Sequence, residues 1–168
     1  MADLWTLGAK AGALLIQRRE RVAVSESSSG GLISAALLAV SGASAYYTAG
    51  GVIYTPRAIF GLLGVEKEDI VSRGIRSSSE PYARFVAETI RSRVRVEWGL
   101  SETGAAGPSG NPYGDPAGHT CMAVVGAVTQ SRTLRTGSDN RKANMHAFAE
   151  GALGLLIEVL EAAPVSQR

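Results

Sequence analysis

The chain has 168 residues, of which 45% are apolar, and its formal net charge is only +2. This length and composition predict one globular domain over residues 1–168, with an ordered core over about 1–162 and a tail at 163–168. The sequence contains no apolar run near the roughly 20 residues that span a bilayer, and it lacks the basic-then-apolar start of a signal peptide. We therefore expect a soluble cytoplasmic protein with no membrane partner.

Cysteine, histidine and charge patterns exclude several further classes. The lone Cys121 cannot form an internal disulfide, and together with two separated histidines it predicts neither a metal site nor a cofactor. Basic residues gather at 18–21 and 91–95, but no aromatic side chains alternate with them. Because a nucleic-acid surface needs a continuous basic face, we interpret both groups as solvated helix ends and expect no nucleic-acid partner.

In the first half of the chain, hydrophobic periodicity alternates between helix and strand. Asp3 is placed to cap a first helix, because it directly precedes apolar residues at helical spacing. Thr55-Pro56 is typical of an N-cap followed by proline at the first helical position, and Gly64 ends that short helix. Between these helices we expect a strand at 21–24, a helix at 32–40 and a short buried strand at 51–54.

The second half continues the same alternation. Ser79-Glu80-Pro81 opens a helix, and apolar residues recur at helical spacing from Ala149 to Leu160, which predicts a long amphipathic helix from about Asn140. Strand-like segments lie at 96–101, 120–125 and 132–134. Strands and helices mixed in this order predict an α/β domain with helices on both faces of a partly parallel sheet.

The run Ser25-Glu26-Ser27-Ser28-Ser29-Gly30-Gly31 lies where the first strand gives way to a helix. Free N–H groups and the helix dipole favour a phosphate, a carboxylate or a developing oxyanion there, and glycine lets the backbone come close. A plain capping role remains open, because Ser28 or Ser29 would be an ordinary N-cap. The run lacks the lysine of a Walker A loop and the flanking glycines of a nucleophile elbow.

A second glycine-rich segment, Thr103-Gly104-Ala105-Ala106-Gly107-Pro108-Ser109-Gly110, directly follows a predicted strand. Successive N–H groups there can form an anion-binding nest, although an ordinary surface loop has the same composition. In such sheets ligands gather at the carboxyl ends of strands. We therefore predict one site built from the serine turn at 25–31, Tyr54-Thr55, the loop from Thr103 and the turn at 137–141.

Taken in order, these motifs resemble the CinA C-terminal-domain family, the nicotinamide mononucleotide amidohydrolases. The serine run is similar to the family's Ala-Glu-Ser-Cys-Thr-Gly-Gly signature, and the likeness covers nearly the whole chain. It continues through the segments 41–45, 50–54, 62–65, 79–80, 103–108, 116–118 and 137–141. The resemblance implies a three-layer α/β/α sandwich with a mixed, mostly parallel sheet, and a homodimer. It also implies metal-independent hydrolysis of nicotinamide mononucleotide to nicotinate mononucleotide and ammonia.

The resemblance also implies residue roles. Ser27 matches the nucleophilic serine, Tyr54 matches the tyrosine of a Tyr-Ser-x-x-x-Lys motif, and Arg141 matches an arginine that binds phosphate or carboxylate. We expect the N–H groups around Ser28 to Gly31 to donate to the oxyanion. The remaining residues expected to bind substrate are Glu26, Ser28, Ser29, Gly30, Gly31, Thr103, Gly104, Ala105 and Gly107. Glu26 is equally compatible with a structural role.

One position departs from the family in a way that bears on chemistry. Where the family has the lysine that activates the serine, this chain has Ile59, which cannot accept a proton. Arg57 is no substitute base, and His119 is either a base near neutral pH or a structural histidine. Two hypotheses follow. One is an amidohydrolase that acts through Ser27, and the other is a catalytically silent paralogue that binds a pyridine nucleotide or a similar phosphorylated ligand.

Overall fold

A five-stranded sheet forms the middle layer of the domain, in the order β2-β1-β3-β4-β5. The computed structural model describes residues 3–165. The strands are β1 (Val22–Glu26), β2 (Tyr47–Val52), β3 (Trp98–Ala105), β4 (His119–Val125) and β5 (Thr129–Arg135). β1 pairs in parallel with β2 and β3, whereas β4 pairs antiparallel with β3 and β5. Among the described strands, β4 therefore runs antiparallel to the other four.

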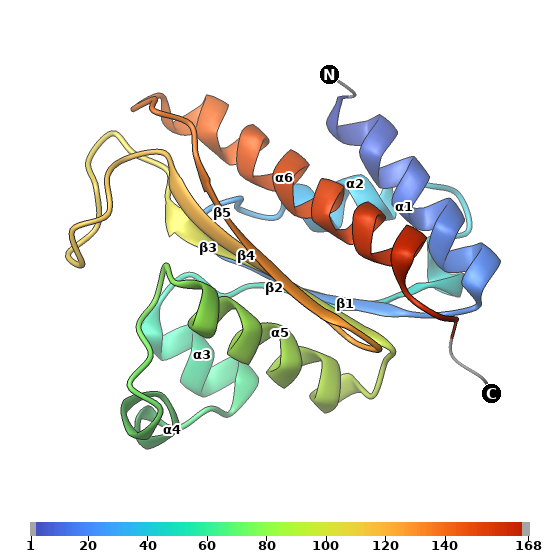
Figure 1. Cartoon of the computed structure of the whole chain (residues 1–168), viewed down its shortest axis with the longest axis horizontal. Coiled ribbons are helices and arrows are strands. Elements are labelled where there is room, and N and C mark those ends of the chain that lie inside the picture. The colour runs from blue at the N-terminus through green and yellow to red at the C-terminus, as the bar shows by residue number, and fades with distance from the viewer. Residues whose placement is uncertain (1–2, 166–168) are drawn as a thin grey trace.

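Helices cover both faces of this sheet (Figure 1). One face carries α1 (Leu4–Arg18), α2 (Leu32–Leu38) and α6 (Arg141–Ala162), and the other carries α3 (Pro56–Leu63), α4 (Lys67–Ser72) and α5 (Glu80–Val94). A short 3₁₀ turn, Ala43–Ala45, precedes β2. The larger apolar core lies under α1, α2 and α6, and a smaller one lies under α3 and α5. The predicted three-layer α/β/α fold with a mixed sheet is confirmed.

Local capping signals account for the starts of four helices. The Asp3 carboxylate accepts hydrogen bonds from two amides of the first turn of α1, and Thr55 accepts from the third residue of α3. Ser79 caps α5, and Asn140 caps α6. Each side chain satisfies amides that have no partner within the helix. The helix starts predicted at these positions are therefore confirmed.

The largest differences from the predicted strand boundaries lie in β2 and β3. The strand expected at 51–54 is wrong in position, because β2 begins at Tyr47 and ends at Val52. β2 is an edge strand whose residues alternate between half-buried and exposed, so it lacks the continuous apolar run of a buried strand. β3 continues to Ala105, so the expected loop begins three residues later than Thr103. The short helix α4 was not predicted, and none of its residues is buried.

Arg18 is not the solvated residue that its charge suggested. Its guanidinium is buried, lies 2.7 Å from a carboxylate oxygen of Glu20, and donates to the carbonyls of Leu160, Ala163 and Pro164. It therefore joins the end of α1 to the end of α6 and holds the chain beyond residue 162. Residues 166–168 of the predicted tail lie outside the described residues. Within the described chain, no helix is long and apolar enough to cross a membrane.

Candidate functional site

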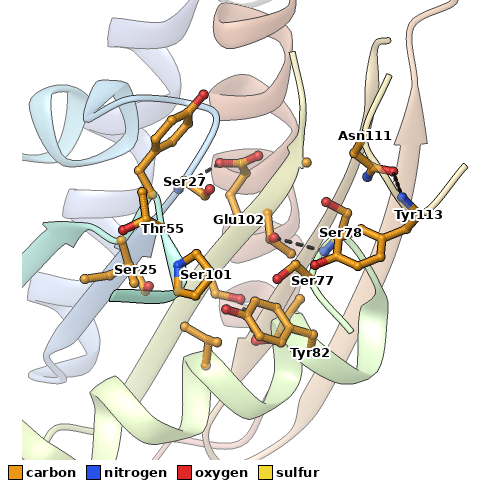
Figure 2. Close-up of a pocket in the computed structure, with 17 residues that line it drawn as sticks. Ser25, Ser27, Thr55, Ser77, Ser78, Tyr82, Ser101, Glu102, Asn111 and Tyr113 are labelled. Atoms are coloured by element: carbon orange, nitrogen blue, oxygen red, sulfur yellow. Dashed lines mark hydrogen bonds between the residues drawn. The ribbon is translucent and has the colours of Figure 1, made fainter. Parts of the chain in front are cut away.

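A cavity of about 270 Å³ opens at the carboxyl ends of β1 and β3 (Figure 2). Its volume is near the lower end of the roughly 300–1,000 Å³ typical of small-molecule pockets. Its polar lining comes from five segments that are far apart in the sequence: Ser25 and Ser27, Tyr54 and Thr55, Ser77 and Ser78, Ser101 to Thr103, and Asn111 with Tyr113. Ile53, Tyr82 and Val86 contribute apolar wall.

Glu102 fixes the serine turn at this cavity. Its side chain is 2% exposed, and its carboxylate points toward Ser27 (Figure 2). One oxygen accepts from the amides of Ser27 (3.2 Å) and Ser29 (2.9 Å). The other accepts a short hydrogen bond from the Ser28 hydroxyl and a second, at 2.7 Å, from Thr120. Because four donors converge on one buried carboxylate, the turn is held rigidly against β3 and β4.

Glu26 caps the helix that follows. Its buried carboxylate accepts from the amides of Gly31, Ile33 and Ser34 and from the hydroxyls of Ser29 and Ser34, at 2.6–3.0 Å. The N-cap residue of α2 is Gly31, which makes no side-chain cap. The alternative in which Ser28 or Ser29 is the N-cap is therefore wrong. The Glu26 carboxylate, at the end of β1, caps the helix instead and lies at the positive end of its dipole.

Most of the turn's amides are not free to stabilise an oxyanion. The N–H groups of Ser29, Gly30 and Gly31 donate to Glu102, to a carbonyl within the turn and to Glu26, respectively. The expected donor role is thus wrong for these three amides. Within residues 28–31, the Ser28 amide has no acceptor among the described residues. The turn thus has one amide without an acceptor, and Ser28 is not among the residues that line the cavity.

Tyr54 and Arg141 lie together beside the cavity. The Arg141 guanidinium donates to the Tyr54 hydroxyl at 2.9 Å and to the Gly107 carbonyl at 2.7 Å. Gly107 has a φ of +106°, and a Cβ at this position would lie 2.6 Å from the Asp139 carbonyl. The close approach of these two loops therefore requires glycine. Ser27 is half-buried and faces the same cavity as Tyr54.

Thr103 and Gly104 contribute the β3 side of the cavity. The Thr103 hydroxyl accepts from the Ser78 amide at 3.2 Å, which joins β3 to the loop before α5. Ser78 is buried and has a φ of +57°, an uncommon conformation for a residue with a side chain. Ala105 is buried at the end of β3. The site residues inferred from sequence therefore separate into those that face the cavity and those that support it.

His119 occupies a structural position. It is 4% exposed, and its Nε2 lies 3.0 Å from the Ser78 carbonyl and 3.6 Å from the Asp115 carboxylate. Because Nε2 faces a carbonyl, it carries the proton, and Nδ1 is buried with no hydrogen-bond partner in the described chain. Arg76 donates to Asp115 at 2.7 Å and lowers the pKa of that carboxyl to about 2.

Ile59 lies behind the cavity wall. It is 1% exposed and belongs to the apolar cluster that also contains Ile53 and Val86, both of which line the cavity. Ile59 itself is not among the residues that line the cavity, and it provides no proton acceptor. The Tyr54 hydroxyl contacts a guanidinium rather than an amine. No group of three or more His, Cys, Asp or Glu side chains among residues 3–165 is arranged to hold a metal ion.

Sequence reasoning overlooked Glu102. A single charged residue within the otherwise uncharged strand segment 98–105 was the available signal, because buried carboxylates are rare unless they have partners. The other polar cavity residues that were not named in advance are Ser77, Ser78, Tyr82, Ser101, Asn111 and Tyr113. They come from separate segments, and periodicity cannot show that these segments meet.

Fold and cavity together define a three-layer α/β/α domain with a candidate small-molecule site at the carboxyl edge of its sheet. The chain belongs to the CinA family, because the family model described as "CinA C-terminal domain" matches residues 5–160. A CinA-like protein from Gloeobacter violaceus is 37% identical over 138 residues, and one from Desulforapulum autotrophicum is 32% identical over 152 residues. These matches cover 82% and 90% of this chain but only 32% and 36% of the relatives. The chain therefore spans about a third of the length of these curated relatives.

Solved structures agree with the family assignment. A competence-damaged protein (CinA) superfamily protein from Klebsiella pneumoniae has a TM-score of 0.86 at 25% identity, and the match covers 95% of this chain and 99% of that one. A competence/damage-inducible protein from Agrobacterium tumefaciens has a TM-score of 0.85 at 28% identity, with 96% and 97% covered. The whole chain is thus similar to nearly the whole of each of these structures.

Proposed function

We propose that this chain binds nicotinamide mononucleotide or a related phosphorylated amide in the cavity, and that Ser27 hydrolyses the carboxamide at a low rate. The observation that carries this proposal is the convergence of Ser27, Tyr54 and Thr103 on one cavity, with Arg141 bonded to Tyr54. These are the positions that match the family's nucleophile, tyrosine, substrate loop and anion-binding arginine. Their meeting at one edge of the sheet supports a shared ligand.

Arg141 suits a phosphate for two reasons. A guanidinium has five N–H donors, and its bonds to Tyr54 and Gly107 leave donors available. It is also the first residue of the long helix α6, where the helix dipole favours an anion. The phosphate of a mononucleotide would therefore lie outside Tyr54, and the ring would enter the cavity toward Ser27.

Hydrolysis would proceed by attack of the Ser27 hydroxyl oxygen on the carboxamide carbon, release of ammonia and hydrolysis of the ester by water. The hydroxyl proton needs a base, and the carbonyl oxygen needs donors. Position 59 supplies no base, and three of the four amides from 28 to 31 are already bonded. These features favour slow turnover, and they are also what supports the second candidate, a silent paralogue that binds the same ligand.

The deciding experiment measures ammonia released from nicotinamide mononucleotide by the purified chain and by Ser27→Ala. We expect slow release that Ser27→Ala abolishes, whereas Ser92→Ala, on the exposed side of α5, retains it. Ligand-dependent thermal stabilisation without ammonia would favour the silent paralogue. Ammonia release that survives Ser27→Ala would assign the chemistry to other residues. The absence of both ammonia release and thermal stabilisation would overturn both candidates.

A further inference from the structure

Glu102 is the only charged side chain in the lining of the cavity, as far as the described residues go. The other polar groups of the lining are hydroxyls, amides and tyrosines, which are uncharged near neutral pH. Glu102 is almost completely buried, so water screens its charge poorly. A carboxylate in the lining of the cavity therefore influences which ligands bind there.

The network around Glu102 consists of hydrogen-bond donors. Two of its four donors are the amides of Ser27 and Ser29, which can only donate. The other two are the hydroxyls of Ser28 and Thr120, and no Lys, Arg or His side chain of the described chain contacts the carboxylate. Each carboxylate oxygen therefore accepts two hydrogen bonds.

The cavity thus has a charge polarity. The Glu102 carboxylate lies in its lining, and the Arg141 guanidinium lies beside it, bonded to Tyr54. Tyr82 and Tyr113 also line the cavity, and tyrosine rings favour cations over neutral groups of the same shape. A ligand that complements this arrangement has a delocalised cation near Glu102 and an anion near Arg141.

We propose that Glu102 makes the cavity selective for an oxidised, cationic pyridinium ring over the reduced, uncharged dihydropyridine ring. This inference rests on the proposed function, because it takes a pyridine nucleotide as the ligand. Nicotinamide mononucleotide and its reduced form have nearly the same shape, the same ribose and the same phosphate. The ring charge is their main difference, so their affinity ratio reports the electrostatic contribution of the cavity.

The test compares the affinities of both nucleotides for the wild-type chain, Glu102→Gln and Thr120→Val by titration calorimetry. Glutamine preserves the network, because its carbonyl accepts from the two amides while its NH₂ donates to the hydroxyls of Ser28 and Thr120. Thr120→Val removes one hydrogen bond and retains the charge. It therefore controls for disturbance of the turn.

For the wild-type chain we expect the oxidised nucleotide to bind about tenfold more tightly or better, which is the scale of one charge pair about 6 Å apart in a partly buried site. Glu102→Gln should bring the ratio close to one, and Thr120→Val should retain it. Equal wild-type affinities, or a ratio unchanged in Glu102→Gln, would overturn the inference and leave the proposed function standing.

Two smaller ligands separate this inference from the proposed function. 1-Methylnicotinamide is a cation without ribose or phosphate, and nicotinamide is its neutral counterpart. A preference for the cation that Glu102→Gln removes, without binding of either nucleotide, would support the role of Glu102 and refute the nucleotide as ligand. Failure of all four ligands to bind would refute both.

Discussion

Replacement of Asp115 by asparagine tests the loop that closes one side of the cavity. Asp115 accepts from Arg76 at 2.7 and 3.1 Å and from Asn111 at 2.8 Å, and it is 9% exposed. Hydrogen bonds from Arg76 lower its pKa from 3.8 to about 2. Asn111 in turn accepts from the amide of Tyr113, and both residues line the cavity. The ion pair therefore stabilises the fold and the wall of the site together.

The stability that Asp115→Asn should lose follows from proton linkage. A pKa that falls from 3.8 to about 2 on folding corresponds to a contribution of at most about 2.4 kcal/mol to the free energy of unfolding at neutral pH. Because the Arg76 side chain is 43% exposed, solvent screening reduces the expected loss in Asp115→Asn to about 1–2 kcal/mol. The folded pKa is the lower one, so the contribution is complete above the unfolded pKa and is lost as the pH falls through about 2. At pH 3 about half of it should remain.

Urea unfolding of the wild-type chain and Asp115→Asn at pH 7 and pH 3 measures this effect. The difference in unfolding free energy should be about 1–2 kcal/mol at pH 7 and about half of that at pH 3. Asp139→Asn, which changes an exposed aspartate in the turn before α6, is the matched control and should show little difference at either pH. An Asp115→Asn difference that does not depend on pH would refute the reasoning.

Three further predictions concern the ligand, the base and self-association. Arg141→Ala should weaken the binding of nicotinamide mononucleotide about tenfold or more without affecting the binding of nicotinamide riboside, because it removes a charged donor to phosphate. Equal losses of affinity for the two ligands in calorimetry would contradict this. Ile59→Lys should lower the melting temperature, since Ile59 is buried among apolar side chains, and should raise ammonia release by about 10²–10⁴-fold if the amine reaches Ser27. Ile59→Met is its control, and release no faster than that control would contradict the missing-base explanation. We also expect a dimer in sedimentation experiments, and a monomer throughout the micromolar range would refute that expectation.

Structural features that depend only on neighbouring residues could be predicted, because their interactions lie within one helical turn. Asp3, Thr55 and Ser79 each precede their helix and bond to its first amides, so their role requires no knowledge of the rest of the chain. The apolar repeat from Ala149 to Leu160 likewise marks the buried face of α6. The same local signals placed the serine turn and the later loop at the carboxyl edge of the sheet.

Features that depend on contacts between distant segments could not be predicted. Glu26 caps α2 from within a strand, five to eight residues before the amides that it binds, which is outside the spacing of ordinary caps. Glu102 is 75 residues from the Ser27 amide that it holds. The edge position of β2, which moved its boundary from the predicted one, is a property of strand order rather than of its own residues.

The most direct test of the central claim is a crystal structure of Ser27→Ala with nicotinamide mononucleotide bound. We predict that the phosphate lies within hydrogen-bond distance of the Arg141 guanidinium and that the pyridinium ring enters the cavity between Tyr82 and Glu102. The carboxamide should face position 27. A nucleotide bound elsewhere, or one with its phosphate inside the cavity next to Glu102, would contradict the assignment of this cavity as the ligand site.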